Sequence, residues 1–328
     1  MIRVGILRGG NSNEYEVSLK SGEMLLTHLP RDRYEPVDIL VDRDGVWHMR
    51  GLPVEKDKLS RHVDVIWNAL HGGAGEDGKI AQELEALGIP YTGSGPFAGA
   101  LGMHKRFSKE VAEKSGLNIA NDILIPNFNS QDELSFEDYM SEAAKYIFKT
   151  LPPPWIIKPV SGGSSIGIKL ARTYDDLLET LLGQLETEGD ILVEEYIHGK
   201  EATVTTLEGF RGEDIYSFLP IEIRKPSGDI FDYDTKYNGQ ALEISPGKFS
   251  STEQKLLQDY ARAMHKALGA RHYTRSDFIV SKNGIYFIEI NTLPGLTKES
   301  LVPKSLEPVG SNFKEFIDHV LKLVTDKK

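Results

Sequence analysis

Short apolar runs alternate with segments of helical periodicity through the first third of the chain. Residues 2–7 and 63–70 are apolar and end in glycine-containing polar loops, so we expect two buried strands. Residues 17–29 and 80–87 instead place apolar side chains at helical spacing. Strands that alternate with helices predict an open α/β domain with a mostly parallel sheet, whose ligand loops lie at the carboxyl ends of the strands.

The middle of the chain has a different pattern. Residues 131–154 are polar, then helical, then proline-rich, which indicates a connector into a new structural unit. Further apolar strands are expected at residues 155–158 and 191–193. Ser251 and Gln254 form a potential capping box ahead of an amphipathic helix.

The last two predicted strands lie on either side of Asn283-Gly284 and form a hairpin over residues 277–291. We expect a three-residue loop, residues 282–284, because this register places Asp277 opposite Glu289 on one face of the hairpin. A two-residue Asn283-Gly284 turn with regular pairing would leave Glu289 on the other face.

Composition narrows the classes of function. The 328 residues are enough for two or three domains, and 40% hydrophobic with 27% charged residues is typical of a globular protein. A formal net charge of -11 argues against nucleic acid or an anionic membrane as a partner, because both need a basic field. The absence of cysteine excludes disulfides and thiolate chemistry. No apolar run is long enough for a signal peptide or a membrane span, so we expect a cytoplasmic protein.

A potential phosphate-binding loop follows one predicted strand. Lys158 ends that strand, and residues 161–167 read Ser-Gly-Gly-Ser-Ser-Ile-Gly. Small residues let backbone N–H groups approach phosphate oxygens, and the lysine adds a cation. The segment is not a Walker A loop, because it lacks the Gly-Lys-Ser/Thr ending. On this segment alone, a flexible hairpin tip is an equally good interpretation.

A second group of polar residues lies on the predicted hairpin. Residues two apart in a strand share a face, so Glu289 and Asn291 project together and, with Asp277, can offer oxygens to Mg²⁺. Solvated strand-end groups are the better interpretation of Glu-x-Asn in isolation. Arg275 would add a cation on the same face for a transferring phosphoryl group.

Acidic residues and one histidine follow the first two expected strands. Glu14 and Glu16 can bind an ammonium group, or can favour the N-terminus of the next helix through its dipole, which is locally the stronger interpretation. His71 precedes Glu76 and Asp77 in a glycine-rich loop. A single histidine in such a loop more often orients a substrate or caps the loop than binds a metal.

Several long motifs resemble those of the D-alanine:D-alanine ligases, from end to end of the chain except in a diverged stretch at residues 127–153. The motifs are GGNSNEYEVSLKSG from Gly9, HGGAGEDG from His71, IPYTGSG from Ile89, KPVSGGSSIG from Lys158, FDYDTKY from Phe231, RSDF from Arg275 and EINTLPGLTKESLVP from Glu289.

This resemblance implies a fold of mixed α/β and α+β class. An N-terminal open parallel-sheet α/β domain, which binds substrate, is expected at residues 1–97 and is followed by a two-part ATP-grasp fold. The central ATP-grasp subdomain would cover residues 98–190. The C-terminal ATP-grasp and metal-binding domain would cover residues 191–328.

The resemblance also implies ATP as co-substrate and two Mg²⁺ or Mn²⁺ ions. In this family, lysines hold the ATP phosphates, one of them in a loop that closes over the site. The positions that match ATP-binding residues are Lys105, Lys158, Ser165, Glu194, Ile197, Glu201 and Lys236. The positions that match the metal ligands are Asp277, Glu289 and Asn291.

Further positions match the family's substrate-binding and catalytic residues. They comprise an ammonium anchor for the first D-alanine, a hydrogen-bonded triad that includes it, stabilisers of the tetrahedral oxyanion, and contacts to the two substrate carboxylates. Glu14 matches the ammonium anchor, and it forms the triad with Ser164 and Tyr237. Arg275 and the backbone of Gly295 match the oxyanion stabilisers. His71 matches the contact to the first carboxylate, and Ser300 and Leu301 match the contacts to the second.

Two stretches depart from the family's pattern. The chain reads Met103-His104-Lys105 where the family usually has Met-Asp-Lys, so an acid is missing beside a phosphate-binding lysine. We expect an altered local structure with the chemistry retained, because Lys105 is present. Residues 244–249, which follow the expected closing loop, are also atypical.

The implied activity is ATP-dependent ligation of two D-alanines through an acyl phosphate, for peptidoglycan precursor synthesis. Two alternatives stay open: a related ligase with another second substrate such as D-lactate, and a nucleotide-binding regulator without turnover. Tyr237 argues against D-lactate, because family members that prefer the hydroxy acid tend to depart from Lys-Tyr there. Retention of every expected metal ligand argues against the regulator. The family also implies a homodimer.

Overall fold

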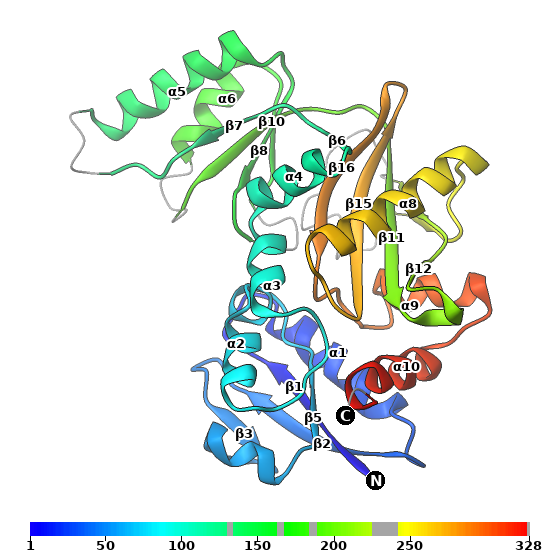
Figure 1. Cartoon of the computed structure of the whole chain (residues 1–328). Helices are drawn as coiled ribbons and strands as arrows, with labels where there is room; N and C mark the ends of the chain where they lie inside the picture. Colours follow the sequence, from blue (N-terminus) through cyan, green and yellow to red (C-terminus); the bar gives the residue numbers. More distant parts are fainter. Residues whose placement is uncertain (130–133, 163–166, 184–188, 225–241, 327–328) are drawn as a thin grey trace.

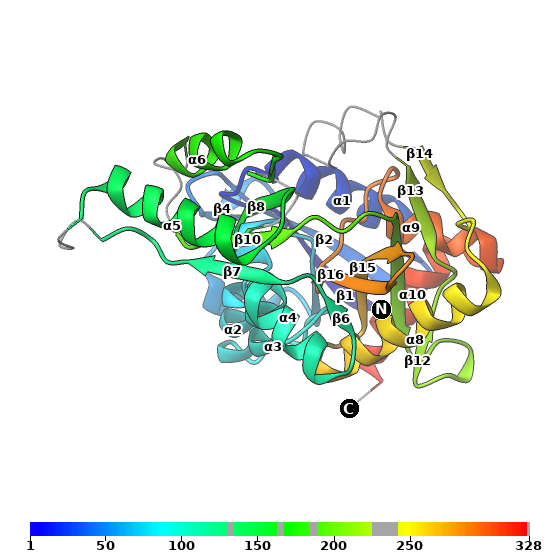
Figure 2. The same ribbon diagram turned by 90° about the horizontal axis from the view of Figure 1, so that it is seen from above.

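Three sheets make up the computed structural model, which describes residues 1–129, 134–162, 167–183, 189–224 and 242–326. In Figure 1 the first sheet lies at the bottom, the second in the upper lobe, and the third at the right. The view from above in Figure 2 shows the second sheet and its helices projecting to one side of the other two. Within the described ranges, no helix is both long and apolar enough to cross a membrane.

The N-terminal sheet has the order β4-β3-β2-β1-β5. Its centre is parallel, because β1 pairs in parallel with β2 and β5, while β3 and β4 add an antiparallel edge. This arrangement confirms the open α/β domain. The elements are β1 Ile2–Gly9, α1 Tyr15–His28, β2 Tyr34–Val41, β3 Trp47–Met49, β4 Leu52–Pro53, η1 Lys56–Arg61, β5 Val65–Asn68, η2 Gly73–Gly75 and α2 Lys79–Ala86.

The second sheet is antiparallel, with the order β7-β10-β8-β9. Helices α5 and α6 pack together on it and share one apolar core with the sheet. The sheet includes β10, so it extends past residue 190. Its elements are β7 Asp122–Ile125, α5 Phe136–Thr150, β8 Trp155–Pro159, β9 Lys169–Ala171, α6 Tyr174–Leu182 and β10 Ile191–Glu195.

The third sheet is the largest, with the order β14-β13-β11-β15-β16-β6 and β12 paired to β11. Helices α3, α4 and α8 pack on it around a separate apolar core. The elements are α3 Pro96–Met103, α4 Lys105–Lys114, β6 Asn118–Ile119, β11 Lys200–Glu208, η4 Phe210–Gly212, β12 Ile215–Ser217, β13 Ile221–Arg224, β14 Leu242–Ile244, α8 Ser251–Ala267, β15 Tyr273–Ser281, β16 Gly284–Asn291, α9 Leu301–Leu306, η5 Glu307–Val309 and α10 Phe313–Thr325.

The last helix, α10, returns to the first sheet. Phe316 on α10 packs against Trp67 of β5 and Tyr273 of β15, in one core shared by the N-terminal and C-terminal parts of the chain. Asp318 accepts hydrogen bonds from Arg33 at 2.6 Å and from the Tyr34 hydroxyl at 3.1 Å. Both chain ends therefore lie at the same end of the molecule (Figure 1).

The helix cap at the start of α8 differs from the prediction by one residue. Ser250, not Ser251, is the N-cap, and it exchanges hydrogen bonds with Glu253 rather than Gln254. Ser250 has extended backbone angles, φ -65° and ψ 158°, as an N-cap requires, whereas Ser251 is already the first helical residue. A capping box therefore starts α8, as predicted, but its two residues each lie one position earlier than predicted.

The hairpin between β15 and β16 has a two-residue turn, so the predicted three-residue loop is wrong. Ser281 pairs with Gly284, and the pairing is regular up to Phe278 opposite Phe287. A β-bulge then shifts the register, and Asp277 pairs with Glu289. The extra residue, Ile288 on β16, therefore brings Asp277 opposite Glu289. The prediction had attributed this alignment to a longer turn.

Candidate active site

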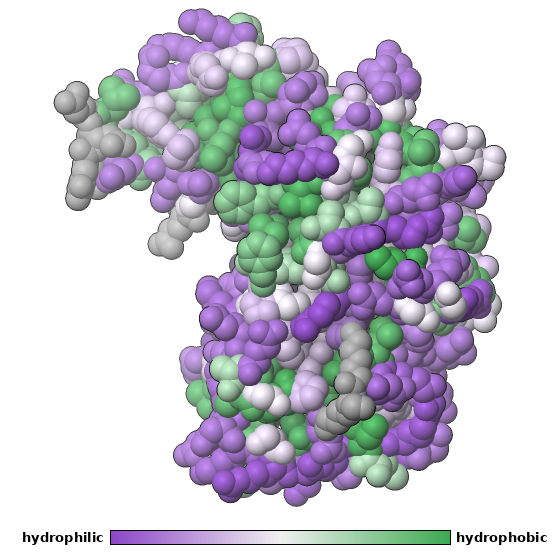
Figure 3. Space-filling view, in the orientation of Figure 1, coloured by the Kyte–Doolittle hydropathy of each residue, from purple (hydrophilic) through white to green (hydrophobic). Residues whose placement is uncertain are grey.

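Two adjoining pockets lie between the sheets, and Arg275 and Glu289 line both of them. We call the pocket that is also lined by Lys158 and Glu201 the first pocket. The pocket that is also lined by Lys105 is the second pocket. Figure 3 shows a notch on one face between the lobe that carries α5 and α6 and the N-terminal domain. The expected ATP-binding and metal-binding positions within the described residues thus converge from separate parts of the chain.

Branched apolar side chains form much of the first pocket. Ile156 and Ile168 come from the second sheet and its loop, while Ile223 and Ile279 come from the third. An apolar slot of this kind can enclose a flat ring, and the polar groups at its edge can fix the ring's orientation. The expected nucleotide-binding positions that line it are Lys158, Glu194, Ile197 and Glu201, together with Leu301, which was expected to contact substrate.

A buried chain of charges holds one wall of this pocket. Glu194 Oε2 lies 2.7 Å from Lys158 Nζ, and its Oε1 accepts a hydrogen bond of 2.7 Å from Lys109 Nζ. The Lys109 ammonium also lies 2.6 Å from Asp122 Oδ2, and Asp122 pairs in turn with Arg106. The chain joins α4 on the third sheet to β7, β8 and β10 of the second.

Glu194 is ionised despite being fully enclosed. Burial by itself would raise the pKa of its carboxyl, but Lys158 and Lys109 outweigh that effect and lower the pKa to about 2. Both carboxylate oxygens are engaged by lysines. The side chain therefore orients Lys158, while the residue still forms part of the pocket wall.

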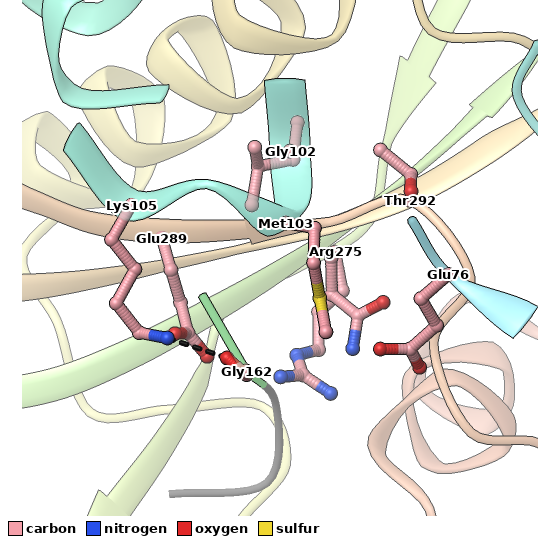
Figure 4. Close-up of a pocket in the computed structure, with 10 residues that line it drawn as sticks. Glu76, Gly102, Met103, Lys105, Gly162, Arg275, Glu289 and Thr292 are labelled. Atoms are coloured by element: carbon pink, nitrogen blue, oxygen red, sulfur yellow. Dashed lines mark hydrogen bonds between the residues drawn. The ribbon is translucent and has the colours of Figure 1, made fainter. Parts of the chain in front are cut away.

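Figure 4 shows the second pocket, with the Lys105 ammonium beside Glu289 and Arg275 at the centre. Lys105 is the first residue of α4, and its Nζ donates to the carbonyl of Gly162, in the glycine-rich loop after β8. The pKa of Lys105 is lowered, because the effect of burial outweighs that of the nearby Glu289 carboxylate, which raises it. Glu76, which reaches in from the N-terminal domain, lies on the opposite side of Arg275.

The residues expected to bind metal are brought together by the hairpin register. Asp277 pairs with Glu289, and Arg275 pairs with Asn291, so all four positions share one face. Two carboxylates with phosphate oxygens and water suit Mg²⁺. The Asp277 carboxylate accepts hydrogen bonds from Arg275 at 2.8 and 3.0 Å and from Thr203 at 2.5 Å. A cation would compete with Arg275 for this carboxylate, and no group of three or more His, Asp or Glu that could hold a metal occurs in the described residues.

The expected substrate contacts form a second set of close neighbours. Glu14 is buried, and its carboxylate lies so near Gly72 that a Cβ there would approach Glu14 Oε2 to 2.7 Å. His71 is also buried, with Nδ1 3.6 Å from Glu76 Oε1. Glycine at position 72 therefore lets Glu14 lie close to the loop that carries His71, which we call the histidine loop.

The loop after β16 is tightly folded around Ser300. A Cβ on Gly295 would lie 2.9 Å from Ser300 Oγ, so glycine alone fits at that position without displacing the serine. Ser300 Oγ also accepts a hydrogen bond from the Thr297 N–H at 3.0 Å. This loop carries the backbone expected to stabilise an oxyanion.

His104, which stands where the resemblance led us to expect an acid, caps the helix α4. It is the N-cap of α4, and its Nδ1 accepts a hydrogen bond from Phe107 N–H at 3.3 Å. Its ring also stacks on that of Phe107, with centroids 4.0 Å apart. Burial lowers the pKa of His104, which favours the neutral ring that the cap requires.

Four expected site residues, Ser164, Ser165, Lys236 and Tyr237, lie outside the described residues. The atypical residues 244–249 are described: Ser245 Oγ donates to the Lys304 carbonyl at 3.2 Å, and the Gly247 N–H donates to the Pro220 carbonyl at 2.7 Å.

Sequence reasoning missed several buried polar residues at the site. Lys109 and Asp122 complete the charge chain, Thr203 contacts Asp277, and Ser21 contacts His71. One signal was available for Lys109. Together with Lys105 it falls on the stripe of α4 that also carries Ser108 and Ala112, and all four side chains are buried.

Comparison with known proteins gives full-length matches. The protein-family model for the D-ala D-ala ligase C-terminus matches residues 117–322. The family model for the D-ala D-ala ligase N-terminus matches residues 3–59 and 50–94. D-alanine–D-alanine ligases from Syntrophobacter fumaroxidans and Desulforudis audaxviator are each 35% identical, over 99% of this chain and 98% and 99% of theirs.

Solved structures agree with this result. The VanG D-Ala:D-Ser ligase of Enterococcus faecalis matches with a TM-score of 0.83 at 27% identity, over 99% of both chains. The Bacillus anthracis D-alanine–D-alanine ligase complexed with ATP matches with a TM-score of 0.78 at 27% identity, over 99% of this chain and 98% of that one. The chain belongs to the D-alanine–D-alanine ligase family.

Proposed function

We propose that this protein joins two D-alanine molecules at the expense of ATP, as its relatives' names describe. The observation that carries the proposal is the pair of adjoining pockets that share Arg275 and Glu289. One pocket suits a nucleotide, and the other is bordered by acidic and basic groups that suit small charged substrates. Nucleotide and amino acid would thus meet at one arginine and one carboxylate.

A carboxylate needs activation before an amine can displace one of its oxygens. In the proposed reaction, a D-alanine carboxylate oxygen attacks the γ-phosphorus of ATP, ADP leaves, and an acyl phosphate forms. The amine of the second D-alanine then attacks the carbonyl carbon, and inorganic phosphate leaves as the peptide bond forms. The product is D-alanyl-D-alanine, a peptidoglycan precursor.

This chain's own cations would carry most of the electrostatic stabilisation. Lys105 and Lys158 would bind the ATP phosphates, and Arg275 would neutralise charge on the transferring phosphoryl group and on the tetrahedral oxyanion. Asp277, Glu289 and Asn291 would hold two Mg²⁺ or Mn²⁺ ions. When bound, such ions neutralise phosphate charge and align the reacting oxygens.

The remaining roles follow the family pattern. Glu14 would bind the first substrate's ammonium and His71 its carboxylate, while Ser300, beside Leu301, would bind the second carboxylate. The Gly295 backbone would donate to the oxyanion. Ser164, Ser165, Lys236 and Tyr237 would complete the phosphate site and the closing loop, and Glu194, Ile197 and Glu201 would form the adenine and ribose site.

The division into residues 1–97, 98–190 and 191–328 is part of the same proposal, with β10 at the start of the third part pairing into the sheet of the second. A cytoplasmic location and a homodimer are also part of it. Sedimentation velocity of the purified chain tests the dimer. The activity itself is tested by ADP release with D-alanine, L-alanine, D-serine and D-lactate. Release that requires D-alanine supports the proposal, and equal release with L-alanine would contradict it.

A further inference from the structure

A buried serine links the N-terminal domain to the loop after β16. Ser21 lies on α1 with 0% of its surface exposed. Its Oγ lies 2.9 Å from His71 Nε2 and accepts a hydrogen bond of 3.2 Å from the Leu296 N–H. Leu296 follows Gly295 directly, so one hydroxyl contacts the histidine loop and the loop expected to bind an oxyanion.

The contacts around the His71 ring define where its proton lies. A serine hydroxyl has one hydrogen and two lone pairs. The Leu296 N–H uses one lone pair of Ser21, which leaves one hydrogen and one lone pair. Among the contacts of the described residues, His71 Nε2 is the other partner of this buried hydroxyl, so donation to Nε2 is the arrangement that gives the hydroxyl hydrogen an acceptor. On the other side of the ring, Nδ1 lies 3.6 Å from the Glu76 carboxylate, which favours a proton on that nitrogen. Of the two singly protonated forms, both contacts favour the one with Nδ1–H and an unprotonated Nε2.

We infer that Ser21 is a positioning residue, which holds His71 in the Nδ1–H tautomer and fixes the Gly295-Leu296 peptide relative to it. The catalytic consequence rests on the proposed function, whereas the tautomer does not. Without the hydroxyl, Nε2 loses its hydrogen-bond donor, and the Glu76 carboxylate, 3.6 Å from Nδ1, is left as the weaker influence on the tautomer. The buried Leu296 N–H also loses its acceptor, so the peptide that follows Gly295 can rotate away.

The tautomer can be measured directly in the wild-type protein. Long-range ¹H–¹⁵N correlation spectra distinguish Nδ1–H, Nε2–H and doubly protonated rings, and the His71→Gln spectrum identifies the signals of His71. We expect the Nδ1–H pattern for the singly protonated ring. An Nε2–H pattern would overturn the inference, and this result needs neither substrate nor a folded Ser21 variant.

Ser18 provides a matched control on the same helix. Its side chain is also fully buried, and its Oγ accepts from the Gly9 N–H at 2.8 Å and donates to the Ala69 carbonyl at 2.7 Å. Ser18→Ala and Ser21→Ala each remove a buried hydroxyl with two partners, so both should lower stability by a similar amount. Only Ser21→Ala should change the His71 ring signals and raise the share of rings with Nε2–H.

The kinetic readout separates positioning from general destabilisation. We expect Ser21→Ala to raise the KM for D-alanine roughly ten-fold with the KM for ATP unchanged, as loss of one well-made buried hydrogen bond implies. A wild-type KM and tautomer in Ser21→Ala, or an equal rise in KM in Ser18→Ala, would overturn the inference. Absence of D-alanine-dependent turnover in the wild type would instead refute the proposed function, and the spectra would still decide the role of Ser21.

Discussion

Asp277 lies directly opposite Glu289 because β16 carries one more residue than β15 between the hairpin turn and this pair. The turn itself has two residues, which in a regular ladder would pair Asp277 with Ile288. Burial on β16 shows the same shift, since Ile285 and Phe287 are buried and the next buried position is Ile290. A β-bulge therefore places the two carboxylates on one face.

Substitution of Glu289 tests the proposed metal site. We expect Glu289→Gln to lower turnover by roughly 100-fold and to raise the Mg²⁺ concentration needed for half-maximal activity, because a neutral amide neutralises less of the ion's charge. The measurement is a Mg²⁺ titration of the rate at saturating ATP. Tyr286→Phe, on the same strand, is the control and should leave the titration unchanged. An unaltered Mg²⁺ dependence in Glu289→Gln would remove this residue from the metal site.

Gly284 should resist replacement, because both its backbone conformation and a close neighbour disfavour a side chain there. Its φ is +131°, and an added Cβ would lie 2.9 Å from Asn118 Nδ2, which donates to the Ile285 carbonyl at 3.3 Å. We expect Gly284→Val to lower the free energy of unfolding by roughly 1–3 kcal/mol. Urea denaturation measures the change. Gly269 also has a positive φ, +67°, but has no neighbour within 4 Å of an added Cβ, so Gly269→Val should cost less.

The buried charge chain predicts how stability changes in acid. The folded-state pKa of Glu194 is lowered from 4.5 to about 2, so its contribution is present above about pH 4.5 and is lost as the pH falls toward 2. The full contribution is about 3 kcal/mol, since each pKa unit corresponds to about 1.4 kcal/mol. Urea denaturation of wild type and Glu194→Gln should give stabilities that converge as the pH falls. Glu179→Gln, at an exposed position of α6, should follow the wild type, and a constant gap for Glu194→Gln would contradict this account.

His104 predicts a separate effect near neutral pH. Burial lowers its folded-state pKa below 6.5, so the cap that its neutral ring provides is present above that pH and is lost as the pH falls through the folded-state value. His104→Asp keeps an acceptor at lower pH. We expect the wild type to lose roughly 1 kcal/mol relative to His104→Asp between pH 7.5 and 5.5. Parallel stability curves for the two proteins would show that the cap does not depend on the charge of His104.

Much of the fold could be predicted from periodicity and turn residues. The run that contains Val4 and Ile6 becomes the centre of a parallel sheet, and the glycine at the end of α2, Gly88, has a φ of +65°. Local signals identify such elements because a strand or a helix end depends on neighbouring residues. Pairing register depends instead on packing across the fold. Phe287 and Ile290, on either side of the extra residue Ile288, both lie in the core between the third sheet and its helices.

The candidate site shows the same division. The residues themselves pointed to Lys158 beside its glycine loop and to Glu289 on the hairpin as candidates, whereas Lys105 was predicted only through the family resemblance. Helical spacing could have indicated the burial of Lys109, but the partners of Lys109 and Ser21 could not be assigned, because the contacts join segments that are distant in the chain, such as Lys109 with Glu194. Burial of a polar residue becomes meaningful only when its partner across the fold is known.

The transfer of a carboxylate oxygen to phosphate tests the central claim most directly. D-alanine labelled with ¹⁸O in its carboxylate is incubated with ATP, Mg²⁺ and the protein, and the products are examined by ³¹P NMR and mass spectrometry. The proposed acyl phosphate predicts D-alanyl-D-alanine together with inorganic phosphate that has gained one labelled oxygen per turnover. ADP formation with unlabelled phosphate, or with no dipeptide, would contradict it.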